Sequence, residues 1–310
     1  MINYTIIILL FLLILLIHRF NHFFIFLPKD NTNKIQSLNQ SHNTFLLNII
    51  IIFPFLFKYF EMSFLMPIFF ILIIGLLDDI YNLSVTVRFV SVSFILIIFL
   101  YLNQDYNLSR LIINDYEIEI GFYLGISISL FLLMGFIHVM NMSDGRNGLV
   151  ISYLLLVPLY IIYKKDFGLF HIDLILILIL MIFLNFKNIS YLGNNGLLVI
   201  SVVFGSLLFK YYNEGIVYIR EVFIFFFIPF FDGIYVTINR VLNKKNLFEP
   251  DKNHLHHLPK KNEWYRCLFY IMMFKIILLL LVYHFANFNF IFLFILSILG
   301  YTLLRFRFNP

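Results

Sequence analysis

Long apolar runs alternate with short polar connections along this chain of 310 residues. A helix that spans a membrane needs about 20 mostly apolar residues, or somewhat fewer where aromatic residues flank the run. Cutting the chain wherever charged residues and Asn cluster gives eleven apolar segments, at residues 4–26, 45–57, 64–77, 88–102, 122–140, 149–163, 170–186, 197–212, 222–238, 267–285 and 290–304. The pattern predicts an all-α, polytopic integral membrane protein with about eleven transmembrane helices, forming a single domain over residues 1–310.

The composition agrees with a membrane protein, because 62% of the residues are hydrophobic, 13% are charged and the mean hydropathy is +0.93. A soluble chain is about 45 to 50% apolar and about 25% charged. The lone Cys267 excludes an internal disulfide framework and a thiolate zinc cluster. No basic residue precedes the first apolar run and no small-residue cleavage site follows it, so we expect a retained helix there. We expect membrane lipid, and no nucleic acid, as a partner.

The distribution of basic residues predicts the orientation. With the N-terminus outside, fifteen Lys and Arg residues lie in or beside the cytoplasmic connections, and six lie on the opposite side. An excess of Lys and Arg marks cytoplasmic loops, so we expect the C-terminus in the cytoplasm. The main cytoplasmic loops are then residues 27–44, 78–88, 141–148, 187–196 and 239–266. On the outside, Asp115, Glu117 and Glu119 alternate with apolar residues, a pattern that fits a short hairpin.

Two adjacent carboxylates, Asp78 and Asp79, follow the third apolar segment. Like charges beside lipid repel each other, and both stay ionised at low cost only with a cation nearby. Acids at a membrane edge therefore indicate a functional site. A pair that only marks a helix end at the water interface fits the same pattern.

A second polar cluster, Asn141-Met-Ser-Asp144-Gly-Arg-Asn147-Gly148, follows the fifth segment. Asp144 followed by two nearby glycines predicts a tight turn whose backbone N–H groups face an anion. The alternative is an Asx turn that only joins two helices.

A basic loop after the ninth segment holds His254, His256 and His257, and Asp232 lies inside the apolar run before it. Clustered His residues bind a metal, exchange protons or donate to phosphate oxygens, and an interfacial cluster without a role is the alternative. No Cys lies near, and the available acids are hard oxygen donors, which suit Mg2+ (or Mn2+) better than zinc. Acids for a divalent cation and a basic, His-rich loop together favour phosphoryl transfer.

These motifs resemble one family, the polyprenyl-phosphate N-acetylhexosamine-1-phosphate transferases, bacterial membrane enzymes related to the phospho-MurNAc-pentapeptide transferase. The matching stretches are residues 75–84 with the Asp-Asp pair, residues 141–149, and residues 229–257 with the Pro-Asp-Lys-Asn-His-Leu-His-His string. The resemblance implies transfer of sugar-1-phosphate from a UDP-N-acetylhexosamine to undecaprenyl phosphate, with release of UMP, at the cytoplasmic face of the bacterial inner membrane. The interrupted His triplet resembles the subgroup that starts O-antigen or related cell-wall glycans.

The resemblance also implies roles for individual residues. The acids expected to act in catalysis and to hold Mg2+ are Asp78, Asp79 and Asp144. The residues expected to bind the substrates are Asn141, Asn147, Arg240, Lys252, His254, His256 and His257. The turn with Asp144 and Asn147 would lie by the nucleotide sugar, and the His residues would bind the donor phosphate. The basic residues would lower the repulsion between two anionic substrates.

Two departures from the family pattern stand out. The family's first cytoplasmic loop carries Arg-Ser-x-His and a Gly-rich stretch, of which this chain keeps only Asp30, Asn33 and Ser37. The family's Gly-Asp-x-Gly-Ser motif appears at residues 193–197 with the amide Asn194 in place of the metal-binding acid, so Asn194 joins the expected metal ligands. Either change is compatible with altered substrate choice, weaker metal binding or a degenerate enzyme.

Two other functional classes stay open. A transporter or flippase would carry inverted repeats and acids near the bilayer midplane, whereas this chain has no visible repeat and its acids gather at one face. A catalytically weakened homologue that scaffolds glycan assembly is kept open by Asn194. A homodimer is compatible with the sequence.

Overall fold

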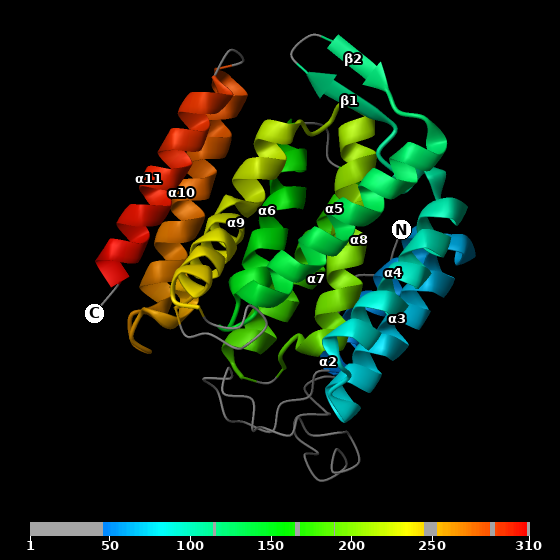
Figure 1. Cartoon of the computed structure of the whole chain (residues 1–310), viewed down its shortest axis with the longest axis horizontal. Coiled ribbons are helices and arrows are strands. Elements are labelled where there is room, and N and C mark those ends of the chain that lie inside the picture. The colour runs from blue at the N-terminus through cyan, green and yellow to red at the C-terminus, as the bar shows by residue number, and fades with distance from the viewer. Residues whose placement is uncertain are drawn as a thin grey trace.

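The computed structural model describes residues 46–113, 116–164, 168–188, 190–244, 253–285 and 289–308. Within these ranges the chain forms a bundle of helices with a two-stranded hairpin at one end (Figure 1). The α-helices are α2 (Leu46–Tyr59), α3 (Met62–Tyr81), α4 (Val85–Leu102), α5 (Phe122–Ser143), α6 (Leu149–Lys164), α7 (Leu169–Phe186), α8 (Gly193–Asn213), α9 (Ile219–Leu242), α10 (Trp264–His284) and α11 (Phe290–Phe308). Two short 3-10 helices are η2 (Gln104–Tyr106) and η3 (Leu255–His257).

Ten of the eleven predicted apolar segments are confirmed as helices, and their ends differ from the prediction by four residues at most. Among the described residues, eight helices (α3, α4, α5 and α7 to α11) are long and apolar enough to cross a membrane. The helices α2 and α6 are apolar but shorter. The predicted segment 4–26 and loop 27–44 lie outside the described residues. The chain is thus a polytopic, helical membrane protein, as its apolar pattern predicts.

Three predicted loops, 78–88, 141–148 and 187–196, are wrong in extent because the helices run further into them. The helix α3 continues through both carboxylates of the Asp pair, α5 continues to Ser143, and α8 already begins at Gly193. Polar residues remain helical here because their side chains find partners on neighbouring helices, which offsets their burial.

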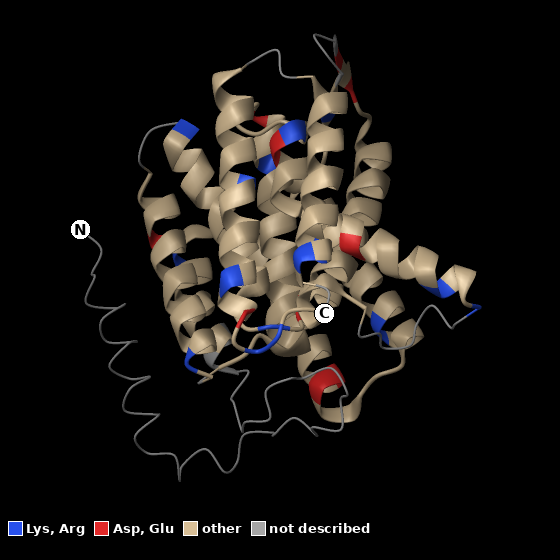
Figure 2. Ribbon diagram, turned by 90° about the vertical axis from the view of Figure 1, so that its left-hand side faces the viewer, with Lys and Arg blue, Asp and Glu red and all other residues tan. Residues whose placement is uncertain are grey.

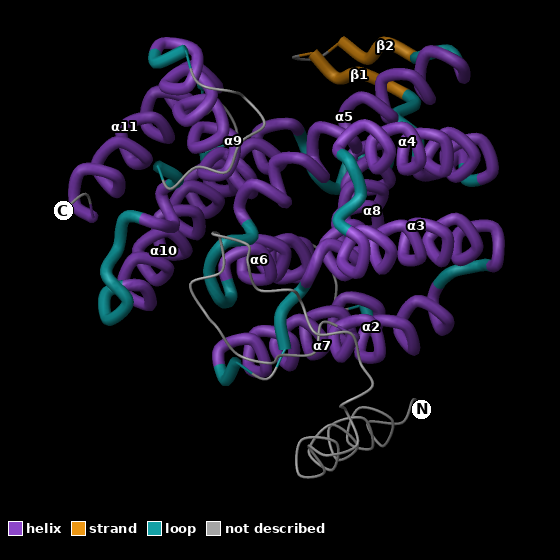
Figure 3. The backbone as a smooth tube through the Cα atoms, turned by 60° about the horizontal axis from the view of Figure 1, so that its bottom comes forward, coloured by secondary structure: helices purple, strands orange, loops and turns teal. Residues whose placement is uncertain are grey.

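The helix α8 forms the centre of one half of the bundle and packs between α3 and α5 (Figure 3). Gly75 of α3 makes this packing close, because a Cβ atom at that position would lie 2.3 Å from the Cα atom of Asn195. Gly205 plays the same part on the α5 side, where a Cβ atom would lie 2.4 Å from a methyl group of Leu133. The Asp pair of α3 therefore lies directly beside the first turn of α8.

The hairpin consists of β1 (Arg110–Ile113) and β2 (Tyr116–Glu119), which pair antiparallel with Arg110 opposite Glu119. This confirms the predicted hairpin, and it means that the described fold is not purely helical. Hydrogen bonds fix the strand to the bundle, since the Ile112 N–H donates to the Tyr212 hydroxyl at 2.8 Å. The hairpin lies at the end of the bundle opposite to the Asp pair (Figure 1).

The second half of the bundle contains α9, α10 and α11, and α6 lies between this group and the α2–α7 pair (Figure 3). Charged residues are sparse along the helices (Figure 2). The helix α9 contains Pro229 in its interior and bends, so that its C-terminal part projects sideways from the bundle (Figures 1 and 2). Sharp bends in helices occur most often at proline.

Candidate active site

The Asp pair lies against the N-terminus of α8. The two carboxylate oxygens of Asp79 accept backbone N–H groups of Asn194 at 3.0 Å and Asn195 at 3.2 Å. The first N–H groups of a helix have no intrahelical acceptor and favour an anion, so Asp79 stabilises the start of α8.

Asp78 is buried, with 2% of its surface exposed, and is not an acid at an open helix end. Its Oδ2 atom accepts hydrogen bonds from the Arg88 guanidinium at 2.6 Å and from the Asn194 side-chain Nδ2 at 2.7 Å. Each carboxylate of the pair therefore has its own stabilising partner, which offsets their mutual repulsion. Asp78 pairs with Arg88, and Asp79 accepts N–H groups at the N-terminus of α8.

Asp144 follows α5 and lies near Asp79. Solvent reaches its side chain, although protein surrounds it closely. Desolvation by these surroundings, together with the negative charge of Asp79, raises the pKa of the Asp144 carboxyl to about 7. Asp144 thus changes its charge near neutral pH, and it is accessible to a ligand.

The turn after Asp144 does not present the free N–H groups expected from its glycines. The N–H of Gly145 donates to the Ser143 carbonyl, and that of Gly148 donates to the Asn185 side chain. Gly148 has a positive φ of 80°, which explains the glycine. The prediction of an anion site at these two N–H groups is wrong, because protein acceptors already occupy them.

Instead, this turn packs against the His-rich loop. Arg146 donates to the backbone carbonyls of His256 at 3.0 Å and Pro259 at 2.8 Å. A Cβ atom on Gly145 would lie 2.1 Å from Nε2 of His256, so glycine permits the contact. The Trp264 indole N–H donates to the Asn147 carbonyl at 3.0 Å. Two motifs more than 100 positions apart therefore meet.

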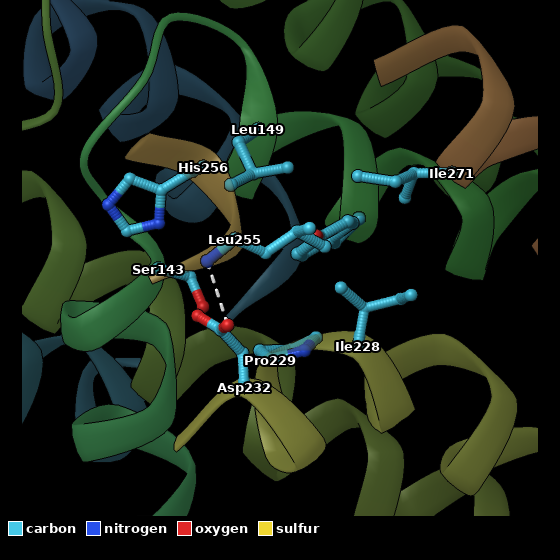
Figure 4. Close-up of a pocket in the computed structure, with 9 residues that line it drawn as sticks. Ser143, Leu149, Ile228, Pro229, Asp232, Leu255, His256 and Ile271 are labelled. Atoms are coloured by element: carbon cyan, nitrogen blue, oxygen red, sulfur yellow. Dashed lines mark hydrogen bonds between the residues drawn. The ribbon is translucent and has the colours of Figure 1, made fainter. Parts of the chain in front are cut away.

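Asp232 of α9 anchors the His-rich loop. Its carboxylate accepts a hydrogen bond from Nδ1 of His254 at 2.8 Å. It accepts another from the Leu255 N–H at 2.8 Å (Figure 4). The Tyr301 hydroxyl donates to the same carboxylate at 2.9 Å, and Arg305 lies 3.5 Å from it. Because a carboxylate partner fixes the proton on Nδ1, Nε2 of neutral His254 is left as an acceptor.

The imidazole rings of the loop lie close to one another. His254 and His256 lie nearly parallel, with centroids 5.4 Å apart, and His257 lies 4.2 Å from His256. Burial, the nearby imidazoles of His257 and His254, and the positive charge of Arg146 hold the pKa of His256 well below its usual range. His256 is therefore neutral at pH 7, and it can interact with an anion only as a hydrogen-bond donor.

A small pocket lies next to these groups. Its polar lining residues are Ser143, Tyr153, Asp232 and His256, and the other lining side chains, including Leu149, are apolar (Figure 4). The pocket joins the end of α5, the bend of α9 and the His-rich loop.

Comparison with known proteins shows a similarity to one family. Residues 61–212, which include the Asp pair, the Asp144 turn and Asn194, match the model of glycosyl transferase family 4. The chain is similar to glycosyl transferase family 4 over just under half of its length.

A Bacillus subtilis (strain 168) protein is similar to this chain, with 27% identity over 201 residues. Its name is "Probable undecaprenyl-phosphate N-acetylglucosaminyl 1-phosphate transferase". The match covers 61% of this chain and 55% of the relative, so it spans about half the length of the relative.

The acids of this chain suit a hard cation that is bound partly by substrate. In the described residues, no three His, Cys, Asp or Glu side chains converge on one point. Mg2+ is commonly bound by one or two carboxylates plus substrate phosphates. Asp79 and Asp144 meet this requirement, because they lie close enough to interact electrostatically and Asp144 is accessible.

The other predicted site residues have more varied positions. The Asn147 side chain donates to the Asn188 side chain at 2.6 Å, and the Asn141 carbonyl accepts the Asp144 N–H. Arg240 is buried in the last turn of α9. Lys252 lies outside the described residues.

Sequence reasoning missed four residues of this site, Arg88, Arg146, Tyr301 and Arg305. In the sequence, the three Arg residues were used only as part of the excess of basic residues that predicts the orientation. Arg305 donates to the Asn253 carbonyl at 2.6 Å and so ties α11 to the His-rich loop. Basic residues close to acidic motifs at the same membrane face are the signal that was available for Arg88 and Arg146.

Proposed function

We propose that this chain transfers N-acetylhexosamine-1-phosphate from a UDP-sugar to undecaprenyl phosphate and releases UMP. The printed name of the Bacillus subtilis relative supports the lipid acceptor and the type of reaction. The observation that carries the proposal is the meeting of Asp79 and Asp144 with the His-rich loop at one end of an apolar bundle. An acceptor with a polyprenyl tail reaches such a site without leaving the bilayer.

The proposed reaction is direct transfer. An oxygen of the lipid phosphate attacks the sugar-linked phosphorus of the donor, and the bond from that phosphorus to the bridging oxygen breaks, so the bridging oxygen leaves with UMP. The second pKa of a phosphate monoester is about 6, so the lipid phosphate is already largely deprotonated at neutral pH. The chain's main task is then to hold two anionic substrates in line.

Asp79 and Asp144 are the residues that would hold Mg2+, with Mn2+ as an alternative. When bound, the ion supplies neutralisation of the charge that builds up on the pyrophosphate. Asp78 and Asn194 lie directly behind Asp79 and would tune this site through their mutual hydrogen bond.

The His-rich loop would bind the donor. Neutral His256 would donate a ring N–H to a donor phosphate. His254, oriented by Asp232, would do so in its protonated form, in which Nε2 also carries a hydrogen. The basic side chains Arg240 and Lys252 would lower the repulsion between the two substrates. Asn141 and Asn147 would lie by the nucleotide sugar.

We further propose the bacterial cytoplasmic membrane as the location, with the site facing the cytoplasm and the product starting an O-antigen or another cell-wall glycan. The basic residues of the loops support this orientation. A catalytically weakened scaffold is the second candidate. It is supported by Asn194, an amide at a position that carries an acid in the family pattern.

The test is a radiolabel transfer assay with membranes, undecaprenyl phosphate, Mg2+ and a panel of UDP-N-acetylhexosamines. We expect lipid-linked label from one donor, with Asp144→Asn reducing the rate by at least about 10²-fold because a charge-stabilising group is lost. Gly135→Ala is the matched control, since nothing lies within 4 Å of a Cβ atom there. Correctly inserted protein that transfers no sugar would support the scaffold.

A further inference from the structure

A fully buried lysine lies in the middle of α10 and has no part in the proposed transfer. Lys275 has 0% of its surface exposed and is surrounded by α6, α9 and α10. An ionisable residue inside a membrane-spanning helix is costly to bury, and such residues are usually retained for a function. The partners of Lys275 indicate what that function is.

The Lys275 amino group contacts a carbonyl and an aromatic face. Its Nζ atom donates to the backbone carbonyl of Phe225 at 2.6 Å and lies 3.3 Å from the ring centroid of Tyr153. The Phe227 ring is further away, at 5.9 Å. A carbonyl dipole and a π face both stabilise a cation that has left water.

The carbonyl that Lys275 binds is the one that a proline leaves without a partner. In an α-helix, the carbonyl of residue 225 would accept the N–H of residue 229, but Pro229 has no N–H. An unpaired carbonyl in an apolar interior costs free energy. Lys275 supplies the missing donor from the neighbouring helix, at the place where α9 bends.

The bend determines where the next turn of α9 lies. Asp232 follows Pro229 by three residues, and it binds both His254 and the Leu255 N–H. Pro229 and Asp232 line one pocket (Figure 4). Tyr153 lines the same pocket, and Nζ of Lys275 lies over its ring. Lys275 therefore contacts two walls of the pocket, α6 and α9.

The opposite end of the bundle contains a neutral version of the same arrangement. Pro67 of α3 leaves the Ser63 carbonyl without its helical partner, and the Asn103 side chain donates to that carbonyl at 3.0 Å. Asn103 has no contact with the candidate active site. It offers a control in which a carbonyl freed by proline loses its donor far from the chemistry.

We propose that Lys275 is a positioning residue, which binds the carbonyl freed by Pro229, fixes the bend of α9 and so sets the place of Asp232 and the His-rich loop. The kinetic part of this inference rests on the proposed transfer function. The structural part does not depend on it.

The first experiment tests the carbonyl contact by a double-mutant cycle in thermal stability of the detergent-solubilised protein. Lys275→Met should lower the unfolding midpoint of the protein that keeps Pro229. It should not lower the midpoint of the Pro229→Ala variant, because the new N–H at position 229 can donate to the Phe225 carbonyl. If Lys275→Met alone does not accumulate, the double variant should. Equal losses in both backgrounds, or failure of both proteins, would overturn the proposal.

The second experiment tests positioning. Lys275→Met should raise the KM for the UDP-sugar at least about tenfold. Lys275→Arg keeps a hydrogen-bond donor, so its KM should lie close to the wild-type value. Asn103→Leu should lower the unfolding midpoint without changing that KM. If Lys275→Met and Asn103→Leu behave alike, Lys275 is only a stabilising residue and the proposal fails.

A distance measurement separates this proposal from the proposed function. Leu242 in α9 and Leu303 in α11 are 76% and 66% exposed. Each can be replaced by Cys and spin-labelled in a Cys267→Ala background, which removes the native thiol. Their distance distribution should shift or broaden with Lys275→Met and stay unchanged with Asn103→Leu. This readout holds even if the wild type transfers no sugar. An unchanged distribution in Lys275→Met would overturn the positioning role.

Discussion

At the scale of single residues, Asp232 holds α9, the His-rich loop and α11 together at the candidate site. It lies in an apolar run, where an isolated carboxylate would be unstable, and it is tolerated because His254, the Leu255 N–H, Tyr301 and Arg305 surround it. These partners come from the His-rich loop and from α11. The carboxylate therefore links three parts of the chain and fixes which nitrogen of His254 carries the proton.

Asp232→Asn should impair transfer by about 10- to 100-fold. The amide can no longer hold the Nδ1 proton of His254 by a charged hydrogen bond, and such bonds contribute about 1.5–3 kcal/mol. The measurement is kcat/KM for the UDP-sugar. Tyr301→Phe is the control, because it removes one hydrogen bond to the same carboxylate and leaves the His254 contact, so its effect should be smaller. Equal activity of wild type and Asp232→Asn would separate His254 from the reaction.

Asp144 should make metal binding pH-dependent. Its pKa of about 7 in the folded protein lies above the ordinary value of 3.8, so the folded state holds this proton more tightly than the unfolded state. The stability that the bound proton contributes is present at acid pH and is lost as the pH rises from about 4 to about 7. Cation binding requires the opposite, deprotonated form.

The apparent affinity for Mn2+ should therefore be about tenfold weaker at pH 6 than at pH 8, because one proton competes with the ion. Titration of free Mn2+ by electron paramagnetic resonance checks this, without lipid, since the lipid phosphate titrates in the same range. Asp144→Asn should bind more weakly and lose the pH dependence. A pH dependence that persists in that variant would assign it to another group.

Asn194→Asp should change how strongly the protein depends on Mg2+. The Asn194 amide donates to Asp78 at 2.7 Å, so an acid there would place two carboxylates in contact. Two like charges 4 Å apart repel by about 4 kcal/mol at an effective dielectric of 20. We expect a lower unfolding midpoint without metal, a larger rise on adding Mg2+, and half-maximal transfer at lower Mg2+. Asn194→Ser controls for loss of the amide. An unmoved metal titration would mean that Asn194 does not lie at the metal.

At the scale of elements, the apolar pattern predicted ten described helices and the hairpin, because lipid exposure imposes long apolar runs. It placed the ends of α3, α5 and α8 wrongly, since polar residues were taken as loop. Asp78 stays helical because Arg88 and Asn194 satisfy it. Arg88 lies 10 positions from Asp78 and Asn194 lies 116 positions away. The contact with Asn194 cannot be predicted from spacing along the chain.

The motif residues of the site were also predictable, whereas their arrangement was not. The Asp144 turn was expected to bind an anion through free N–H groups, but Ser143 and Asn185 accept two of them. The contact of Arg146 with the His-rich loop joins residues 110 positions apart. Such contacts depend on how the helices pack, which a single sequence does not specify.

Gly75→Ala should separate α3 from α8. The added Cβ atom would lie 2.3 Å from the backbone of Asn195, which cannot move aside like a side chain. Overpacking of this kind costs about 1–3 kcal/mol, and it should also weaken the hydrogen bonds of Asp79 to the α8 N-terminus. We expect a lower unfolding midpoint and weaker Mn2+ binding.

Gly135→Ala in α5 is the matched control for Gly75→Ala. Its Cβ atom meets nothing within 4 Å, so the change should be neutral or slightly stabilising through helix propensity. If the two variants are equally stable and bind Mn2+ alike, the close contact between α3 and α8 does not support the site.

At the scale of the whole molecule, the candidate site and the hairpin lie at opposite ends of the bundle (Figure 1). A membrane around the apolar helices would therefore separate them. The basic residues favour the cytoplasm for the end that carries the site. This orientation matters for the proposed function, because nucleotide sugars are made in the cytoplasm.

Cysteine labelling in intact cells tests this orientation directly. In a Cys267→Ala background, Glu117→Cys on the hairpin and Lys260→Cys beside the His-rich loop each place one thiol at an exposed position. A membrane-impermeant maleimide should label Glu117→Cys in intact cells and Lys260→Cys only after the membrane is permeabilised. Both variants should be labelled in detergent, which shows that each thiol is reactive. The reverse pattern would put Asp144 and the His-rich loop on the outer face, away from the nucleotide sugar, and the proposed transfer reaction would then be untenable.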